Sequence, residues 1–290
     1  MRENTARLQL VLAMAVFGTL GLFVRQIDLS SAALALCRAL MAAVLLGALF
    51  LLRREKLSKE IRAALPQLLL SGAAMGVNWI LLFEAYRYTT ISLATLSYYF
   101  APALVMIACP LLFREKLTGR QLVCFLCSTA GLVLVIGAGD GAGSAPLRGM
   151  LLGLSAAVFY AAVILLNKSV PEAAGLQRTF VQFLAAAAVL APYVALTGGL
   201  SLGGLSRAGW ACLLAVGVVH TFGAYCLYFS ALRRLRGQET AVLSYLDPAV
   251  AVFLSAAVLG ERTAPLQLFG GALIVAFAMW NEWSAARQNS

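Results

Sequence analysis

Long apolar runs recur along the entire chain, and short polar, charged or glycine-rich breaks separate them. Each run has roughly the 17–22 residues that an α-helix needs to cross a hydrocarbon core. A soluble globule of 290 residues could not bury the apolar surface of a chain that is 62% hydrophobic and 12% charged. Because lipid offers no partner to backbone N–H and C=O groups, each run is expected to be a helix. The runs fall at about 8–24, 32–52, 65–86, 91–113, 119–138, 149–167, 178–197, 209–230, 240–259 and 265–283.

These ten runs predict an all-α integral membrane protein with ten transmembrane helices. Most of the 22 Lys and Arg residues fall at alternate breaks, chiefly in 53–62, 114–120 and 233–236. Cytoplasmic loops carry an excess of basic residues, so we expect both termini in the cytoplasm. The same bias accounts for the net charge of +10. The sequence has no compact basic patch with interleaved aromatic residues, so nucleic acid is not expected as a partner.

Two stretches of the chain, 97–122 and 243–268, repeat one design. In each, an apolar run holds a proline and ends at a glutamate beside a basic residue. The sequence therefore predicts two five-helix repeats, 1–138 and 149–290, joined by a glycine-rich outer linker at 139–148. Since five crossings is an odd number, the second repeat is expected to be inverted, with a substrate site near the midplane between the two. The pairs that align without a gap include Tyr99 with Tyr245, Pro102 with Pro248, Glu115 with Glu261, and Gln121 with Gln267.

The fourth run, which ends in FREKLT at 113–118, and its echo LGER at 259–262 resemble the EamA family of the drug/metabolite transporter superfamily. The resemblance covers nearly the whole chain. It implies a carrier of the bacterial inner membrane, with a cavity lined by helices one to four and six to nine. It also implies peripheral helices five and ten at a homodimer contact, and export of a small-molecule substrate such as an amino acid or derivative. Ala101-Pro102 and Asp247-Pro248 stand where the aromatic amino-acid exporter has Trp-Pro, which argues against that particular substrate.

Pro102 and Pro248 lie inside apolar runs. A proline lacks the N–H that would bond the carbonyl four residues earlier, here that of Tyr98 or Ser244. Lipid cannot satisfy a bare carbonyl, so we expect both to face protein or a wet cavity. The two prolines are predicted to be hinges.

Asp247 lies about two turns inside a predicted span, where an unpaired carboxylate is costly and a functional role is the default reading. It is expected to couple transport to a proton or to bind a cationic amine. The alternative is a structural carboxylate bonded to hydroxyl groups or to an arginine. Ser244 lies three residues earlier on the same helix face.

Three further polar residues lie within apolar runs, each with two readings. Arg38 either holds a substrate carboxylate or extends its guanidinium to the headgroups. His220, the one histidine, is either a proton relay or a neutral hydrogen-bonded residue of the bundle. Asn78 either lines the cavity or bonds a neighbouring helix. Glu84 and Arg87 are expected to form a local interfacial ion pair.

Aromatic residues complete the predicted substrate contacts, because they occur on the helices that line the cavity in the family. Packing is the alternative reading for such stripes at helical spacing. The predicted aromatic contacts are Trp79, Tyr98, Tyr99, Tyr225, Tyr228 and Tyr245.

Other motifs favour structural readings. Cys124 and Cys127 have redox-like spacing, but no nearby charge along the chain would lower a thiol pKa, so packing is expected. Gly137–Asp140 matches the GxGD pattern of intramembrane proteases, yet it falls in the glycine-rich linker. No metal-ligand motif occurs, and no cofactor is expected. A secondary transporter is the leading interpretation, with import of a small organic cation and a membrane-embedded enzyme as alternatives.

Overall fold

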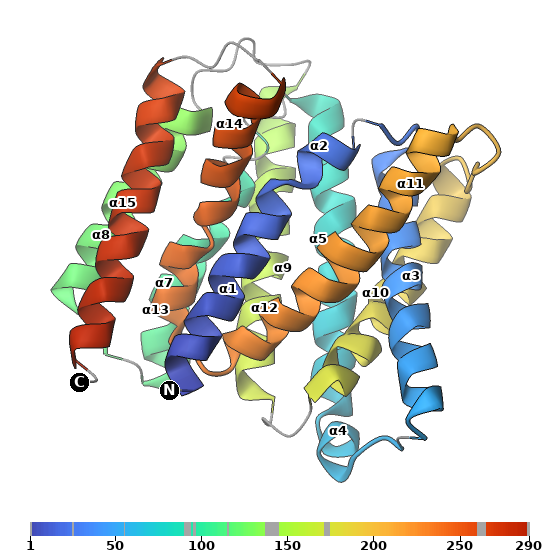
Figure 1. The fold of residues 1–290 in the computed structure, drawn as a ribbon, viewed down its shortest axis with the longest axis horizontal. Helices are drawn as coiled ribbons and strands as arrows, with labels where there is room; N and C mark the ends of the chain where they lie inside the picture. The colour runs from blue at the N-terminus through green and yellow to red at the C-terminus, as the bar shows by residue number, and fades with distance from the viewer. Residues whose placement is uncertain are drawn as a thin grey trace.

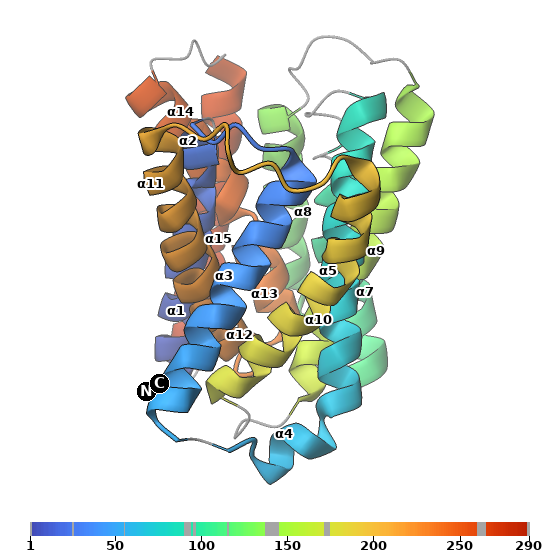
Figure 2. The same ribbon diagram turned by 90° about the vertical axis from the view of Figure 1, so that its right-hand side faces the viewer.

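The computed structural model is a bundle of helices that run from one end of the molecule to the other (Figures 1 and 2). It describes residues 2–24, 26–54, 56–89, 94, 97–114, 116–136, 145–170, 175–259 and 265–288. Within these ranges, every element of regular secondary structure is a helix. The all-α prediction is confirmed.

Helical residues occur in every apolar run that the sequence predicts. The elements before the glycine-rich linker are α1 (Arg2–Gly18), α2 (Leu20–Val24), α3 (Ser31–Leu52), α4 (Lys59–Ala63), α5 (Leu65–Tyr88), α7 (Ala101–Phe113) and α8 (Gly119–Ile136). Those after it are α9 (Pro146–Ser169), α10 (Gly175–Thr197), α11 (Arg207–Ala215), the π-helix η2 (Val216–Gly223), α12 (Ala224–Leu232), α13 (Gly237–Leu243), α14 (Leu246–Leu259) and α15 (Pro265–Gln288). Glu115, Glu261 and residues 137–144 of the linker region lie outside the described residues.

Six helical segments of the described chain are long and apolar enough to cross a bilayer. They are Asn4–Val24, Ser31–Leu52, Leu65–Tyr88, Leu147–Ser169, Leu176–Thr197 and Arg207–Leu232. Shorter apolar helices lie at Ala101–Phe113, Gly119–Leu134 and Leu268–Phe277. The chain is therefore a multi-pass membrane protein, while the full set of ten spans stays a prediction.

Neither the run that holds Pro102 nor the run that holds Pro248 is one continuous helix. A turn precedes both α7 and α14, which begin one and two residues before Pro102 and Pro248. Each proline thus occupies the first helical turn, where its missing N–H breaks no helical hydrogen bond. The expectation that each proline lies inside a continuous helix is wrong. The chain breaks the helix ahead of the proline instead.

Hydrogen bonds hold the segment that joins α3 to α5, at the end of the bundle predicted to be cytoplasmic. The Ser58 hydroxyl accepts the N–H of Ile61 at 3.2 Å and so caps α4. The Ser58 N–H itself donates to Oε1 of Gln177, at the start of α10, at 2.9 Å. Arg54, with φ of 52°, supplies a left-handed residue just after α3. This turn is thereby tied to α10.

Glycines allow the closest helix contacts. A Cβ added to Gly72 of α5 would lie 2.3 Å from the carbonyl oxygen of Gln182 in α10. One added to Gly131 of α8 would lie 2.7 Å from the carbonyl oxygen of Gly270 in α15. Small residues let backbones approach where lipid supplies no hydrophobic drive between helices.

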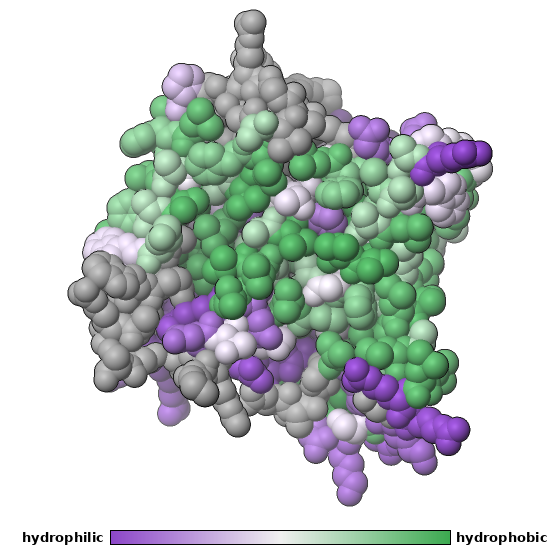
Figure 3. Space-filling view, in the orientation of Figure 1, coloured by the Kyte–Doolittle hydropathy of each residue, from purple (hydrophilic) through white to green (hydrophobic). Residues whose placement is uncertain are grey.

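The outer surface has the distribution that a bilayer requires. Hydrophobic atoms cover the middle of the face seen in Figure 3, and hydrophilic atoms gather along its lower edge and at its upper right. Leu52, Leu111 and Leu196 are 84%, 77% and 86% exposed, which suits contact with lipid tails. Both chain ends lie at the lower end in Figures 1 and 2.

Candidate substrate cavity

A cavity of about 480 Å³ lies among the helices. Its lining includes residues of α2 and of the C-terminal part of α5, which lie at one end of the bundle (Figure 1). This end lies opposite the two termini. Residues from α1, α2, α3, α5, the turn before α7, α9, α12 and α14 line it. They are Phe17, Gly18, Leu20, Gly21, Arg38, Trp79, Leu82, Phe83, Tyr86, Tyr98, Tyr99, Tyr160, Tyr225, Tyr228 and Asp247.

Asp247 supplies the acidic group among these lining residues, from the first turn of α14. The Tyr99 hydroxyl donates a hydrogen bond of 2.8 Å to its Oδ2 atom. A Cβ on Gly18 would lie only 2.7 Å from the Asp247 carbonyl oxygen, so α1 packs directly on the backbone here. Tyr99 and Gly18 together fix where the carboxylate stands.

Arg38 supplies the basic group of the lining, from α3. Its Nε donates to Oγ1 of Thr221 at 3.0 Å, and its guanidinium carbon lies 5.5 Å from the Trp79 ring centroid. That distance is a cation–π contact. With an exposure of 9%, the side chain does not extend to the headgroups. The reading in which Arg38 faces a substrate carboxylate therefore fits its position.

The π-helix η2 explains why Thr221 can hold Arg38. Thr221 donates its hydroxyl hydrogen to the carbonyl oxygen of Val216, five residues earlier, at 2.9 Å. Its oxygen then remains an acceptor for the guanidinium. Single π-helical turns within longer helices are frequent at functional sites.

Aromatic rings form most of the remaining wall. Tyr98 and Tyr160 stack with centroids 5.2 Å apart and planes 12° apart, and the Tyr228 hydroxyl donates to that of Tyr160 at 3.1 Å. Tyr225 lies edge-on to Phe17 at 5.0 Å. These contacts hold the rings in a fixed arrangement, so the wall is preformed.

Asn78 and His220, predicted as site residues, lie outside this lining. The Asn78 amide donates to the Ala156 carbonyl of α9 at 2.6 Å, which is the helix–helix reading. His220 Nε2 lies 2.7 Å from the Thr19 hydroxyl, and its ring lies edge-on to Phe23. Asn78 is thus bonded to a neighbouring helix, and His220 to the turn between α1 and α2.

Ser244 and Tyr245, also predicted, lie behind the wall. The Ser244 hydroxyl donates to the Thr240 carbonyl at 2.8 Å, one turn earlier. Tyr245 is fully buried, and its hydroxyl lies 3.2 Å from that of Thr129 on α8 and 3.5 Å from the Tyr99 carbonyl oxygen. Tyr245 therefore supports Tyr99, which in turn bonds Asp247.

Eight lining residues were not predicted from the sequence, namely Phe17, Gly18, Leu20, Gly21, Leu82, Phe83, Tyr86 and Tyr160. The glycines, three residues apart in an otherwise apolar run, were the available signal. Leu20, Leu82 and Tyr86 carry none, because an apolar side chain at the cavity reads like one at the lipid surface. Phe17, Phe83 and Tyr160 join the lining through their places on the same helices.

Two structural predictions agree with the described contacts. Arg87 Nη1 and Glu84 Oε1 form an ion pair of 3.1 Å, and Tyr193 also donates to Glu84. Cys124 and Cys127 both carry free thiols, with Cys124 buried. Among the described residues no group of His, Cys, Asp or Glu has the arrangement of a metal site.

Both halves of the chain match the model of one protein family. Residues 5–137 and 147–281 each match the EamA-like transporter family. The chain belongs to this family. The EamA domain pattern thus runs through both halves of the chain, on either side of the glycine-rich linker.

Relatives of this EamA chain carry transporter names. An uncharacterized transporter, YxxF of Bacillus subtilis, is 29% identical over 282 residues, covering 95% of this chain and 88% of its own. An uncharacterized transporter of Archaeoglobus fulgidus is 27% identical over 203 residues, covering 68% of this chain and 70% of its own. A protein of known crystal structure superposes with a TM-score of 0.83 at 21% identity, covering 99% of each chain, and so shares the fold.

Proposed function

We propose that this protein is a secondary transporter that exports a small amphipathic zwitterion, an amino acid or derivative, across the bacterial inner membrane by alternating access. Family membership and the names of the relatives support transport itself. The substrate class, the direction and the mechanism are inferences from the cavity and the sequence.

The observation that carries the substrate class is the pair of opposite charges in one cavity. Arg38 stands on α3 and Asp247 on α14, and no ion pair joins these two described residues. Each is instead held by a neutral hydroxyl, that of Thr221 or Tyr99. A zwitterion can place its carboxylate at the guanidinium and its ammonium at the carboxylate, replacing the water that both charges lose on burial.

The rest of the cavity favours an apolar side chain on that zwitterion. Aromatic rings such as Trp79, Tyr98 and Tyr225 present faces and edges to the space. A volume of about 480 Å³ lies within the range of sites for small organic ligands. An amino acid with a sizeable apolar group would use both the charges and the rings.

An inverted repeat of two five-helix units, 1–138 and 149–290, is supported by contacts that exchange in pairs. If α1, α3, α5, α7 and α8 correspond in order to α9, α10, α11–α12, α13–α14 and α15, the packing of α5 on α9 becomes that of α12 on α1. Likewise α10 on α5 becomes α3 on η2, and α7 on α9 becomes α14 on α1. The first helices of the halves run in opposite directions, α1 away from the termini and α9 toward them (Figure 1).

Side chains repeat the same relation. Arg38 on α3 donates to Thr221 on η2, and Gln182 on α10 donates to Ser71 on α5. Tyr99 and Tyr245, which align in the sequence repeat, contact each other, with ring centroids 6.3 Å apart. Equivalent residues that touch must lie at the axis relating the halves. This contact supports an axis beside Asp247, where alternating access would need a substrate site.

Rocking of one half against the other is the proposed motion. Helix α13 packs against α7, and Pro248 and Pro102 lie in the first turn of α14 and α7, after each break. Discontinuous helices at the repeat interface are typical of such carriers. The breaks, with their prolines, are proposed as the hinges.

Proton coupling is assigned to Asp247. Export of a zwitterion against its gradient needs an energy source, and a carboxylate that lines the cavity can exchange a proton for the substrate ammonium. Tyr99 bonds the carboxylate and keeps it in place in either protonation state.

Import of a small organic cation is the alternative that Asp247 and the aromatic lining would also suit. The guanidinium of Arg38 in the same cavity repels a simple cation, so the zwitterion is preferred. The experiment is comparative metabolomics of medium and cells that express wild type or Asp247→Asn. A zwitterion enriched in the medium with wild type alone supports the proposal. Cellular enrichment of a monocation instead favours the alternative, and a chemically altered product favours an enzyme.

A further inference from the structure

An ion pair joins the two halves of the chain at the end of the bundle that holds the termini. Nη2 of Arg7, in the first half, lies 3.2 Å from Oε1 of Glu239, in the second half. Arg7 belongs to α1 and Glu239 to α13, and both residues are buried. Neither lines the cavity that holds Asp247. Two charges removed from water are costly unless they stay paired, so the pair holds α1 against α13.

One face of α1 leads from this ion pair to the cavity. Arg7, Leu10, Met14 and Phe17 follow one another at intervals of three or four residues, which places them on one side of the helix. Leu10 and Met14 are fully buried, and Phe17 lines the cavity. Leu10 and Met14 thus form an apolar plug between the cavity and the ion pair. A polar solute cannot cross packed apolar side chains, so a path at this end requires α1 to separate from its neighbours.

Helix α1 and the α13–α14 segment meet at two levels. The ion pair joins them near the termini, and α1 packs on the backbone of α14 at Gly18 and Asp247, in the cavity. Because α1 belongs to the first half and α13–α14 to the second, rocking of the halves about the cavity contact parts Arg7 from Glu239. The ion pair is therefore a contact that such rocking must break.

Buried polar groups on α13 favour that separation. In the described part of the chain, neither polar atom of the Gln238 side chain has a hydrogen-bond partner, and neither does Oγ1 of Thr240. Both residues are fully buried and flank Glu239 in the chain. Helix α13 packs on α1, α7 and α8 of the first half, so separation of the halves would bring water to it. Hydration would remove the cost of these unpartnered groups, and the ion pair opposes it.

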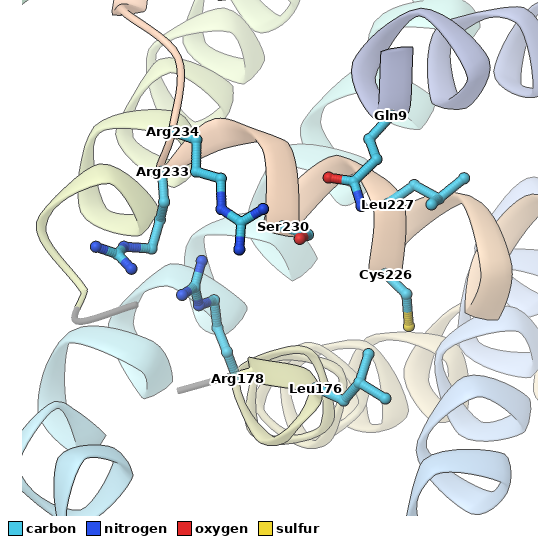
Figure 4. Close-up of a pocket in the computed structure, with 8 residues that line it drawn as sticks. All are labelled: Gln9, Leu176, Arg178, Cys226, Leu227, Ser230, Arg233 and Arg234. Atoms are coloured by element: carbon cyan, nitrogen blue, oxygen red, sulfur yellow. The ribbon is translucent and has the colours of Figure 1, made fainter. Parts of the chain in front are cut away.

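A pocket of about 300 Å³ separates the halves close to Arg7, with α1 on one side and α10 and α12 on the other. Gln9, two residues beyond Arg7, extends from α1 toward Leu227 and Ser230 of α12 (Figure 4). The pocket shares no residue with the cavity that holds Asp247. The halves thus already leave a space at this end, from which an opening can start.

We propose that the Arg7–Glu239 ion pair is the gate that closes the cavity toward the side of the termini. This inference rests on the alternating access proposed above. The gate is closed in the structure. When the halves rock, the pair parts, the plug of Leu10 and Met14 comes away from its neighbours, and solute passes between α1 and α13.

Cysteine labelling in sealed membrane vesicles tests the gate, in a background without the native cysteines. Ala13→Cys reports on the plug, because Ala13 is fully buried and lies between Leu10 and Met14 in the chain. Gly21→Cys reports on the cavity, which exposed Gly21 lines and where an added Cβ would meet no atom within 4 Å. A membrane-impermeant maleimide is added on the side of the termini for Ala13→Cys and on the opposite side for Gly21→Cys.

Glu239→Gln and Arg7→Gln should each raise the labelling rate of Ala13→Cys about tenfold or more and lower that of Gly21→Cys, since opening one end closes the other. The double variant should label no faster than the faster single variant, because it leaves no unpaired charge of this pair buried. Arg236→Gln is the matched control, because it removes a positive charge from an exposed residue just before α13, and it should change neither rate.

Arg7→Gln carries the test if Glu239→Gln fails to fold. Unchanged labelling of Ala13→Cys, an equal rise with Arg236→Gln, or effects that multiply in the double variant would overturn the gate. A rise at both cysteines would show a general loosening of the fold and would overturn it as well.

Solute exchange measured in the same vesicles keeps the gate and the proposed function apart. Exchange by the parent protein with unchanged labelling in the charge variants overturns the gate alone. Opposite changes at the two cysteines, without exchange of any zwitterion, support the gate and overturn the proposed substrate class.

Discussion

Asp247 accepts a hydrogen bond from Tyr99 with an oxygen that an amide would also present. Asp247→Asn should therefore leave the fold intact while removing the negative charge. Losing a charged contact of about 1.5–3 kcal/mol corresponds to roughly 10–100-fold weaker transport. The pH dependence of transport should disappear with it. Initial rates across a pH series, with protein amount checked by immunoblot, make the measurement, and an unchanged pH profile would reject proton coupling at this residue.

Arg38 tests the carboxylate half of the zwitterion. In Arg38→Lys the charge is kept, but the planar fork and the bond from Nε to Thr221 are lost. We expect roughly 10-fold weaker binding of the exported zwitterion and little change for the corresponding amine without a carboxylate. Competition binding with the two ligands compares them. If both weaken equally, the arginine supports structure rather than recognition.

The sequence singled out the polar residues that need partners, but it did not show which of them line the cavity. Asp247, Tyr99 and Arg38 stand out because charged or phenolic groups in an apolar run need partners, and they do line the cavity. His220 and Asn78 stand out for the same reason, yet their partners are Thr19 and the Ala156 carbonyl. A helix that is apolar all round hides which face points inward, so only the packing separates these cases.

The contact of α1 with α14 depends on Gly18. A Cβ there would lie 2.7 Å from the Asp247 carbonyl oxygen and equally close to Val250 Cβ, so Gly18→Ala must separate the helices. Overpacking of this kind costs about 1–3 kcal/mol and should lower the melting temperature by several degrees. Transport should fall as well, because Asp247 moves.

Gly21→Ala is the matched control for this change. Gly21 lines the same cavity, and an added Cβ would meet no atom within 4 Å. Its melting temperature should stay near that of wild type in the same thermal assay. Equal destabilisation by the two substitutions would show that the α1–α14 contact is not the cause.

Helix content was predictable from run length, and helix continuity was not. A proline inside an apolar run fits either a kinked helix or a new helix start, and Pro102 and Pro248 take the second course. The π-helix η2 left no comparable signal, since its residues 216–223 are ordinary apolar ones around His220 and Thr221. Such breaks arise from contacts between helices that a linear pattern does not contain.

The whole molecule makes a prediction about membrane sidedness. Both termini lie at one end of the bundle, and the segment 198–204 after α10 lies at the other (Figure 2). With cytoplasmic termini, Ser201→Cys in a background without the native cysteines should react with a membrane-impermeant maleimide added to intact cells. A fluorescent protein fused to the C-terminus should fold and fluoresce in the cytoplasm. Labelling of Ser201→Cys only after cell lysis would invert the assigned orientation.

The central claim is that one cavity binds a zwitterion through Arg38 and Asp247 and carries it intact across the membrane. Counterflow in sealed proteoliposomes tests it most directly, using the zwitterion that metabolomics identifies, with its chemical identity checked by mass spectrometry. We expect saturable exchange of the unaltered solute by wild type, and at least a roughly 10-fold loss in both Arg38→Gln and Asp247→Asn, each reconstituted in equal amount. Undiminished counterflow in these two variants, or a solute that emerges chemically changed, would contradict the account.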